Sequence, residues 1–125
     1  MGIIETKIIP HNEQRYNTVG DYIEQDGKIV VMTSELGHED MNFLLSLHEV
    51  IEAYLCRKHD ICFQAIDDFD KNFTGEGEPG DSEQAPYHLE HLFAEIIERR
   101  VAMELGVNWS AYEAKIKEVS DTYGR

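Results

Sequence analysis

Two segments of the chain place a histidine and a glutamate one helical turn apart. The first is an H-E-x-x-E pattern that begins at His48 and ends at Glu52, and the second contains His91 and Glu95. Residues four apart on a helix lie on the same face, so each segment can offer an imidazole and a carboxylate to one point in space. If the two helices lie side by side, the four side chains can hold a divalent transition metal. His48, Glu52, His91 and Glu95 are therefore the predicted metal ligands.

Two further carboxylates are predicted to take part in catalysis. Glu49 is adjacent to His48 and could be a further ligand or a base that acts on metal-bound water. Asp81 follows a proline and a glycine, an arrangement that presents its carboxylate rigidly. A mixed set of imidazoles and carboxylates suits transition metals better than calcium. The expected cofactor is a divalent metal ion, with Zn, Mn, Fe and Mg as the candidates.

Each of these residues also has an ordinary structural interpretation. A single histidine on an apolar helix face, as His48 is, is more often a hydrogen-bonded core residue than a metal ligand. Glu98, which two arginines follow, is expected to be a solvated acid, and His88 is expected to occupy a first helical turn. The repetition of the His and Glu spacing in a second segment is what favours a metal site.

The segments that carry these residues have the periodicity of amphipathic helices. Pro86 suits the first turn of the second long helix, and Gly106 suits its end. Helices are predicted over residues 39–58, 62–72, 87–105 and from Asn108 or Ser110 to Val119.

The N-terminal region, residues 1–33, is instead β-prone. Asp26 and Gly27 separate two short apolar runs, and Asp-Gly between such runs is typical of a tight hairpin turn. Farther along, residues 74–85 contain three glycines, a proline and several acids, which predicts an exposed acidic loop.

The length of 125 residues is enough to close one apolar core without disulfides or a structural metal. We therefore expect a single domain over residues 1–125, divided into the β-hairpin region 1–33 and a helical region 34–125. The predicted fold class is α+β, mainly α, with a three or four helix bundle beside a short N-terminal β-hairpin.

The chain is strongly acidic, with 11 lysines and arginines against 25 aspartates and glutamates and a formal net charge of −14. This charge repels a phosphate backbone, so direct nucleic-acid binding is not expected. No segment approaches the roughly 20 apolar residues of a membrane helix. The two cysteines do not form a C-x-x-C pair, and the chain does not begin with a basic, apolar secretory signal. These features predict a cytoplasmic protein.

Three resemblances accompany these motifs. The H-E-x-x-E pattern resembles the H-E-x-x-H of zinc peptidases, with Glu52 in place of the second histidine and Glu49 in the position of the general base. The pairs Glu49 with Glu52 and Glu95 with Glu98 are distantly similar to the paired helices of MazG-like all-α nucleoside triphosphate pyrophosphohydrolases. That resemblance implies magnesium binding, although histidines intrude and the second pair ends in Glu98 rather than aspartate.

A broader similarity, over about residues 35–115, is to small hypothetical proteins of bacteria and their phages. It rests on the H-E-x-x-E pattern together with the runs Glu78-Pro79-Gly80-Asp81, Ala85-Pro86-Tyr87 and Glu90-His91. The resemblance implies a bacterial or phage origin and carries no activity.

Two functions are the main candidates from the sequence, and a simple metal-storing or structural-metal bundle is a third possibility. The first is a metal-dependent hydrolase that acts on a small substrate, phosphorylated or not, at a His and Glu site between two helices. The second is a noncatalytic interaction or inhibitor protein, of phage origin, whose acidic surface binds a basic protein partner. The sequence does not predict an oligomeric state.

Overall fold

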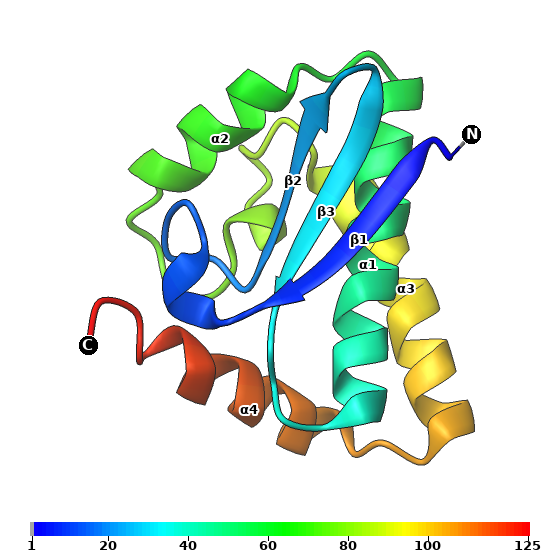
Figure 1. Ribbon diagram of the computed structural model, residues 1–125, viewed down its shortest axis with the longest axis vertical. Helices are drawn as coiled ribbons and strands as arrows, with labels where there is room; N and C mark the ends of the chain where they lie inside the picture. Colours follow the sequence, from blue (N-terminus) through cyan, green and yellow to red (C-terminus); the bar gives the residue numbers. More distant parts are fainter. Residues whose placement is uncertain (1) are drawn as a thin grey trace.

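A three-stranded sheet and four α-helices make up the described part of the chain, residues 2–125, in this computed structural model (Figure 1). The strands are β1 (Ile4–Ile9), β2 (Gly20–Gln25) and β3 (Lys28–Ser34). The helices are α1 (Glu39–Lys58), α2 (Phe63–Asn72), α3 (His88–Leu105) and α4 (Trp109–Ser120), and two 3-10 turns are η1 (His11–Glu13) and η2 (Pro79–Asp81). The predicted α+β class with dominant helices is confirmed.

The predicted hairpin forms part of a larger sheet. Strands β2 and β3 are antiparallel and joined at Asp26 and Gly27, whose φ angles of 54° and 78° match the mirror-image turn that such hairpins prefer. The prediction of a hairpin alone is corrected, because β1 pairs in parallel with the other edge of β3 and gives the order β1-β3-β2. A two-stranded hairpin is marginally stable by itself, and the third strand makes β3 the central strand.

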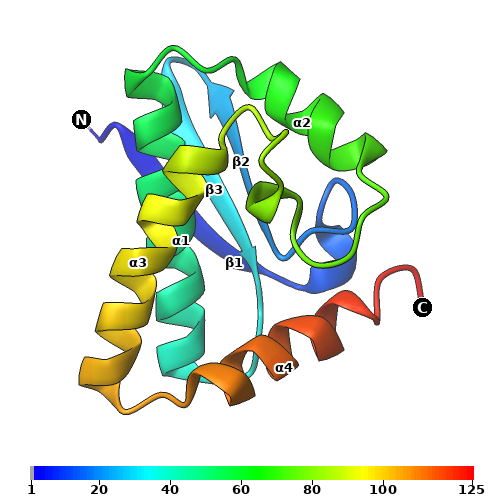
Figure 2. The ribbon, with the colours of Figure 1, turned by 180° about the vertical axis from the view of Figure 1, so that it is seen from behind.

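Helix α1 connects the sheet to the remaining helices. It begins after His38, whose side chain accepts a hydrogen bond from the backbone N–H of Met41. One side of α1 packs on the sheet, and α3 packs antiparallel along another side (Figure 2). Helix α2 lies beside β2, and α4 packs apolar side chains against the cluster shared by α1 and α3. Within residues 2–125, only α1 and α3 pack along each other as the helices of a bundle would. No helix within residues 2–125 has the length and apolar character needed to cross a bilayer.

The inward face of α1 is apolar near both ends of the helix and polar in the middle. Near its start, Leu44 and Leu45 belong to one apolar cluster, which also contains Leu36, Ala102 and Tyr112. Near its end, Ala53 and Cys56 belong to a second cluster, which includes Tyr22, Ile29 and Val31. Between the two clusters, the inward residues are His48, Glu49 and Glu52, all buried. Burying polar groups is unfavourable unless they are paired, so this polar interval requires partners.

The predicted exposed loop, residues 74–85, is partly folded onto α3. Its centre forms the turn η2, and Gly80 within this turn is buried. The carbonyl of Gly80 accepts a hydrogen bond from Nδ1 of His88 at 2.9 Å, which ties η2 to the first turn of α3. The centre of the segment is therefore held against the start of α3, whereas most of its other residues are exposed.

Asp70 links α2 to two other parts of the chain. Its carboxylate accepts hydrogen bonds from the hydroxyls of Tyr16, at 3.2 Å, and Tyr87, at 2.6 Å. No lysine, arginine or histidine among the described residues forms an ion pair with the Asp70 carboxylate. Burial raises the pKa of Asp70 to about 6, and the two tyrosine hydrogen bonds only partly offset that effect.

Asp70→Asn is expected to stabilise the fold near neutral pH. A carboxyl whose pKa is raised in the folded state stabilises that state most below its unfolded pKa, and this contribution is lost as the pH rises through about 6. The amide has no such ionisation, so the advantage of the variant in urea unfolding should be larger at pH 7.5 than at pH 4. Asp68→Asn, an exposed position on the same helix, is the control and should show no comparable pH dependence. An equal effect of Asp70→Asn at both pH values would contradict this assignment.

Candidate metal centre

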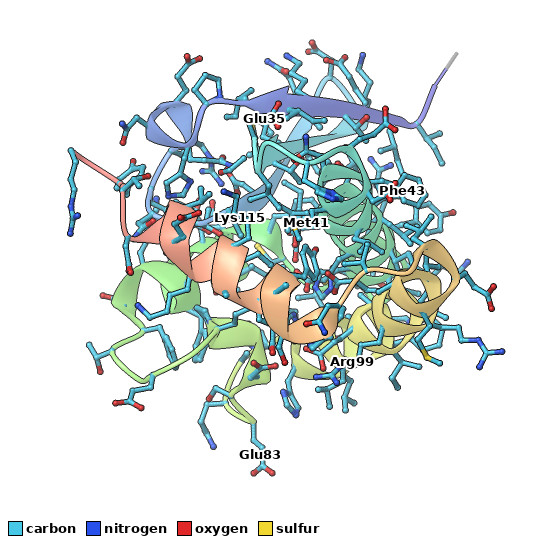
Figure 3. The ribbon with its side chains drawn as sticks, turned by 90° about the horizontal axis from the view of Figure 1, so that it is seen from below. Glu35, Met41, Phe43, Glu83, Arg99 and Lys115 are labelled. Atoms are coloured by element: carbon cyan, nitrogen blue, oxygen red, sulfur yellow. The ribbon has the colours of Figure 1, made fainter. Side chains whose placement is uncertain are left out.

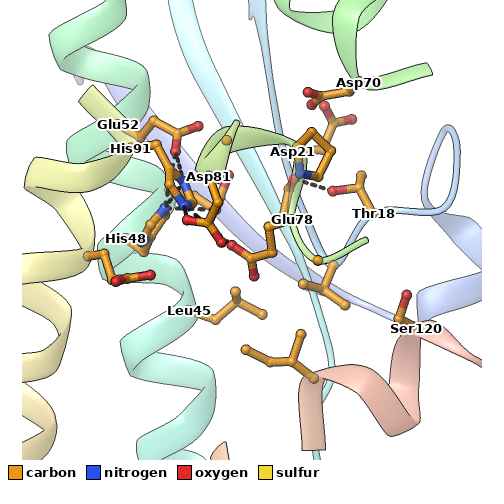
Figure 4. A pocket seen from close by; sticks show the side chains of 18 of the residues that line it. Thr18, Asp21, Leu45, His48, Glu52, Asp70, Glu78, Asp81, His91 and Ser120 are labelled. Carbon is orange, nitrogen blue, oxygen red and sulfur yellow. Dashed lines mark hydrogen bonds and ion pairs between the residues drawn. The ribbon is translucent and has the colours of Figure 1, made fainter. Parts of the chain in front are cut away.

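Side chains from α1 and α3 meet at a buried point between the two helices (Figure 4). Nε2 of His48 lies 3.2 Å from Nδ1 of His91. Oε1 of Glu52 lies 3.1 Å from the first of these nitrogens and 2.9 Å from the second. The three residues are only 3–4% exposed. Two imidazole nitrogens and one carboxylate oxygen thus form a small triangle inside the protein.

Each member of the triangle has a hydrogen-bond partner on its outer side. Nδ1 of His48 lies 2.7 Å from Oε1 of Glu98, whose other oxygen accepts a hydrogen bond from Tyr112. Nε2 of His91 lies 3.0 Å from Oδ1 of Asp81. The second oxygen of Glu52 accepts a hydrogen bond from the hydroxyl of Tyr22 at 2.6 Å. Carboxylates behind histidines and a donor behind a carboxylate are the usual outer partners of metal ligands.

These outer partners favour one arrangement of the ring protons. Both nitrogens of each ring face a carboxylate oxygen, and two outer carboxylates against the single inner oxygen of Glu52 favour hydrogen on Nδ1 of His48 and Nε2 of His91 when the rings are neutral. In the neutral rings, the two inner nitrogens then present lone pairs to each other and to Glu52. Three lone-pair atoms this close repel one another unless a cation lies between them. The cation can be a proton or a metal ion.

The size of the triangle suits a transition metal. Ligand bonds of about 2.1 Å in tetrahedral geometry separate the ligand atoms by about 3.4 Å. The observed separations of 2.9–3.2 Å therefore need to expand by only a few tenths of an ångström.

The charges in the cluster favour a cation at the same point. Burial lowers the pKa of His48, but hydrogen bonds to Glu52 and Glu98 outweigh burial and raise this pKa well above its ordinary value. Burial likewise raises the pKa of Glu52, and its contacts with His48 and His91 lower it to about 2. In the absence of metal, a proton on the histidine pair balances the carboxylates. A metal ion must displace that proton, which makes metal binding weaker at low pH.

Glu49 lies at the edge of the triangle without a hydrogen-bond partner among the described residues. Its Oε2 is 3.9 Å from Nε2 of His48, and the residue is 8% exposed. Burial, followed by repulsion from Glu52, raises its pKa well above the ordinary value. Its side chain fits against the start of β2 only because residue 20 is glycine, since a Cβ at Gly20 would overlap with Cδ of Glu49. Glu49 is thus placed to act as a fourth ligand or as a base.

The remaining predicted residues lie at different distances from the triangle. Asp81 contacts the outer nitrogen of His91, so its geometry is that of an orienting group. Glu95 is not brought into the triangle, and its carboxylate pairs with Arg99 at 3.3 Å. The buried face of α3 is formed by positions 91, 94, 98 and 102, and Glu95 points to the edge of that face. Glu98, expected to be solvated, is 5% exposed and contacts His48.

Sequence reasoning missed several residues that shape the centre. Glu98 lies seven residues after His91, two helical turns on, and this spacing could have placed it on the same face. No signal in the sequence identified Tyr22 or Tyr112, because their pairing depends on how the sheet and α4 pack. Gly80 was expected only to interrupt regular structure in the loop. The structure places it against the His91 ring, where a Cβ would lie 2.6 Å from Cγ and Nδ1.

The triangle opens onto a cavity of about 590 Å³. Figure 4 shows His48, Glu52 and His91 on one side of it, with Asp70 and Ser120 on the other. Eleven of the lining residues are acidic, and Lys117 is the single lysine or arginine among them. Lys117 itself pairs with Asp121 at 2.9 Å. The cavity wall beside the centre is therefore strongly negative.

Comparisons with known proteins do not assign this site to a family. No family model, curated protein or solved structure matched the chain. The interpretation of the centre consequently rests on its own geometry.

Gly80→Ala is expected to weaken metal binding although Gly80 is not a ligand. The added methyl group must push the His91 ring out of the triangle, and such indirect changes typically cost about 10–100-fold in metal affinity. Titration with Zn²⁺ in competition with a chromophoric chelator measures the change. Gln84→Ala, at an exposed position in the same segment, should bind Zn²⁺ as the unaltered protein does. Equal affinities for the two variants would show that Gly80 does not position His91.

Proposed function

We propose that the protein is a metal-dependent hydrolase whose ion is held by His48, His91 and Glu52. The observation that carries this proposal is the convergence of three lone-pair atoms whose outer sides are all occupied by hydrogen-bond partners. Two histidines and a glutamate are also a known ligand set of catalytic zinc, in which the fourth position is left for water or substrate. The imidazole ligands favour Zn, Mn or Fe over Mg.

A structural metal is the simpler alternative, and two features favour catalysis over it. Structural zinc sites are usually closed by four protein ligands, whereas this triangle has three and faces a cavity. The carboxylate nearest the open side, Glu49, lacks a hydrogen-bond donor among the described residues and is available for proton transfer. In this role, Glu49 would take a proton from the attacking water and return it to the leaving group as the bond to the carbonyl carbon breaks.

The negative charge of the cavity wall disfavours anionic substrates. A phosphorylated molecule would meet Asp70, Glu78 and Asp81 without a lysine or arginine to neutralise it, since Lys117 is already paired. Repulsion of this kind discriminates strongly between ligands. We therefore favour a neutral or cationic acyl compound, such as an amide or ester, over a phosphate ester.

A second candidate is the noncatalytic acidic protein that binds a basic partner. The net charge of −14 supports it, and so does the excess of acids along the cavity. This function does not require a metal, so metal content separates the two candidates. For either function we propose a cytoplasmic location, in which Cys56 and Cys62 remain free thiols as they are in the structure.

Metal analysis is the direct test of the centre. Protein purified without chelator or a nickel column is expected to contain about one divalent ion per chain, and His48→Ala and His91→Ala should each lose most of it. A variant distant from the site, His38→Ala, should retain the ion because His38 only caps the start of α1. Unchanged metal content in both ligand variants would refute the proposed site.

Glu49→Gln tests the catalytic role separately from metal binding. With Zn²⁺ bound, the protein is expected to hydrolyse 4-nitrophenyl acetate faster than 4-nitrophenyl phosphate. The variant should keep the ion yet lose about 10²–10⁴-fold in kcat, as expected for removal of a general base. Glu95→Gln, which lies outside the triangle, is the matched control and should retain activity. Loss of the metal in Glu49→Gln would instead identify Glu49 as a fourth ligand.

A further inference from the structure

The outer face of α3 carries an unusual row of exposed apolar side chains. Leu89 is 72% exposed, Ile96 is 65% exposed and Met103 is 73% exposed, and Leu92 and Phe93 lie beside them. The opposite face of the same helix is buried against α1. A helix that is apolar on both faces is normally covered on both. In Figure 2, α3 runs along the outside of the molecule with no other element of residues 2–125 over this face.

The row is long and nearly straight. Leu89, Ile96 and Met103 are spaced by seven residues, so they lie along one line of about 21 Å at 1.5 Å per residue. Scattered apolar residues on a surface need no explanation, but a continuous stripe of this length usually marks an interaction site.

The order of residues along the stripe is symmetric about Ile96. If a second copy of α3 packs antiparallel with a two-fold axis at Ile96, Leu89 lies opposite the partner's Met103. Ile96 then meets its own counterpart. Three residues from the axis on either side are Phe93 and Arg99, so the aromatic ring of each copy lies opposite the aliphatic part of the partner's Arg99. Such self-complementarity is the property required of an interface with two-fold symmetry.

The distribution of charge also favours a second copy of this chain as the partner at this surface. Two copies of a chain with a net charge of −14 repel each other wherever their acidic faces meet. Along the stripe, the exposed charged residues between Leu89 and Met103 are Arg99 and Arg100. Glu95 is neutralised by Arg99, and Glu90 and Glu98 are buried. Figure 3 shows Arg99 directed toward the start of α4, where its guanidinium lies 4.6 Å from the centre of the Trp109 ring. The stripe thus carries no unpaired exposed carboxylate between Leu89 and Met103, so two copies that meet there bring few of their acidic groups together.

We infer that the protein is a homodimer in which the α3 helices of two copies pack antiparallel about a two-fold axis at Ile96. The interface uses the face of α3 opposite His91 and does not depend on the proposed metal or hydrolase function. Each copy keeps its cavity open, because the cavity lies on the other side of the α3 helix.

Sedimentation equilibrium of the full chain tests the dimer. The expected mass is twice 14.4 kDa at micromolar concentration. Ile96→Glu brings two carboxylates together at the centre of the interface and should raise the dissociation constant by about 100-fold or more. Ile8→Glu, which places the same charge at an exposed apolar position on β1, should leave the dimer intact.

Ile96→Cys provides a second test that does not depend on a disruptive charge. A residue on the two-fold axis meets its own counterpart, so mild oxidation should yield a covalent dimer, whereas Ile8→Cys should not. A monomer at all concentrations up to about 100 µM would overturn the proposal, as would a dimer that Ile96→Glu leaves unchanged. If the protein is monomeric and binds lipid vesicles through this face, a membrane surface is the partner of the stripe. That result would also overturn the dimer proposal.

Discussion

The structure depends on how it accommodates several ionisable side chains between two apolar clusters. His48, His91 and Glu52 lie where a protein of this size would ordinarily place leucine or valine. A buried ion pair rarely adds stability over an apolar pair of similar volume, because desolvation offsets the attraction. Stability alone therefore does not explain this arrangement. Its hydrogen-bonded outer partners instead hold the three inner atoms in fixed positions, as a ligand-binding site requires.

The positions of the partners explain the topology around the centre. Tyr22 comes from β2, Tyr112 from α4 and Asp81 from η2, so three separate elements each contribute one group to the outer side of the cluster. His48 and Glu52 both lie on α1, the helix that packs on the sheet. The centre is thus assembled from most of the fold, and the sheet serves it by fixing α1.

The sequence predicted the helices, and the shared face of His48 and Glu52 on α1, because both depend on local spacing. His48 and Glu52 face the same way on any helix, and the helix ends followed from caps and glycines. The prediction was weaker where distant segments meet. The parallel pairing of β1 with β3 depends on contacts across the chain, and a hairpin signal does not contain that information. Glu95 and Glu98 are both compatible with helical spacing, and only the packing of α3 on α1 distinguishes them.

The close approach of Gly20 to Glu49 and of Gly80 to His91 has an evolutionary consequence. At both positions a hydrogen occupies the space that any larger residue would need, so these glycines are constrained together with the side chains they face. Homologues that diverged far enough to lose overall sequence similarity should still keep both pairs. Coupled variation, with glycine lost only when its facing residue changes, would be the most durable signature of common ancestry for this chain.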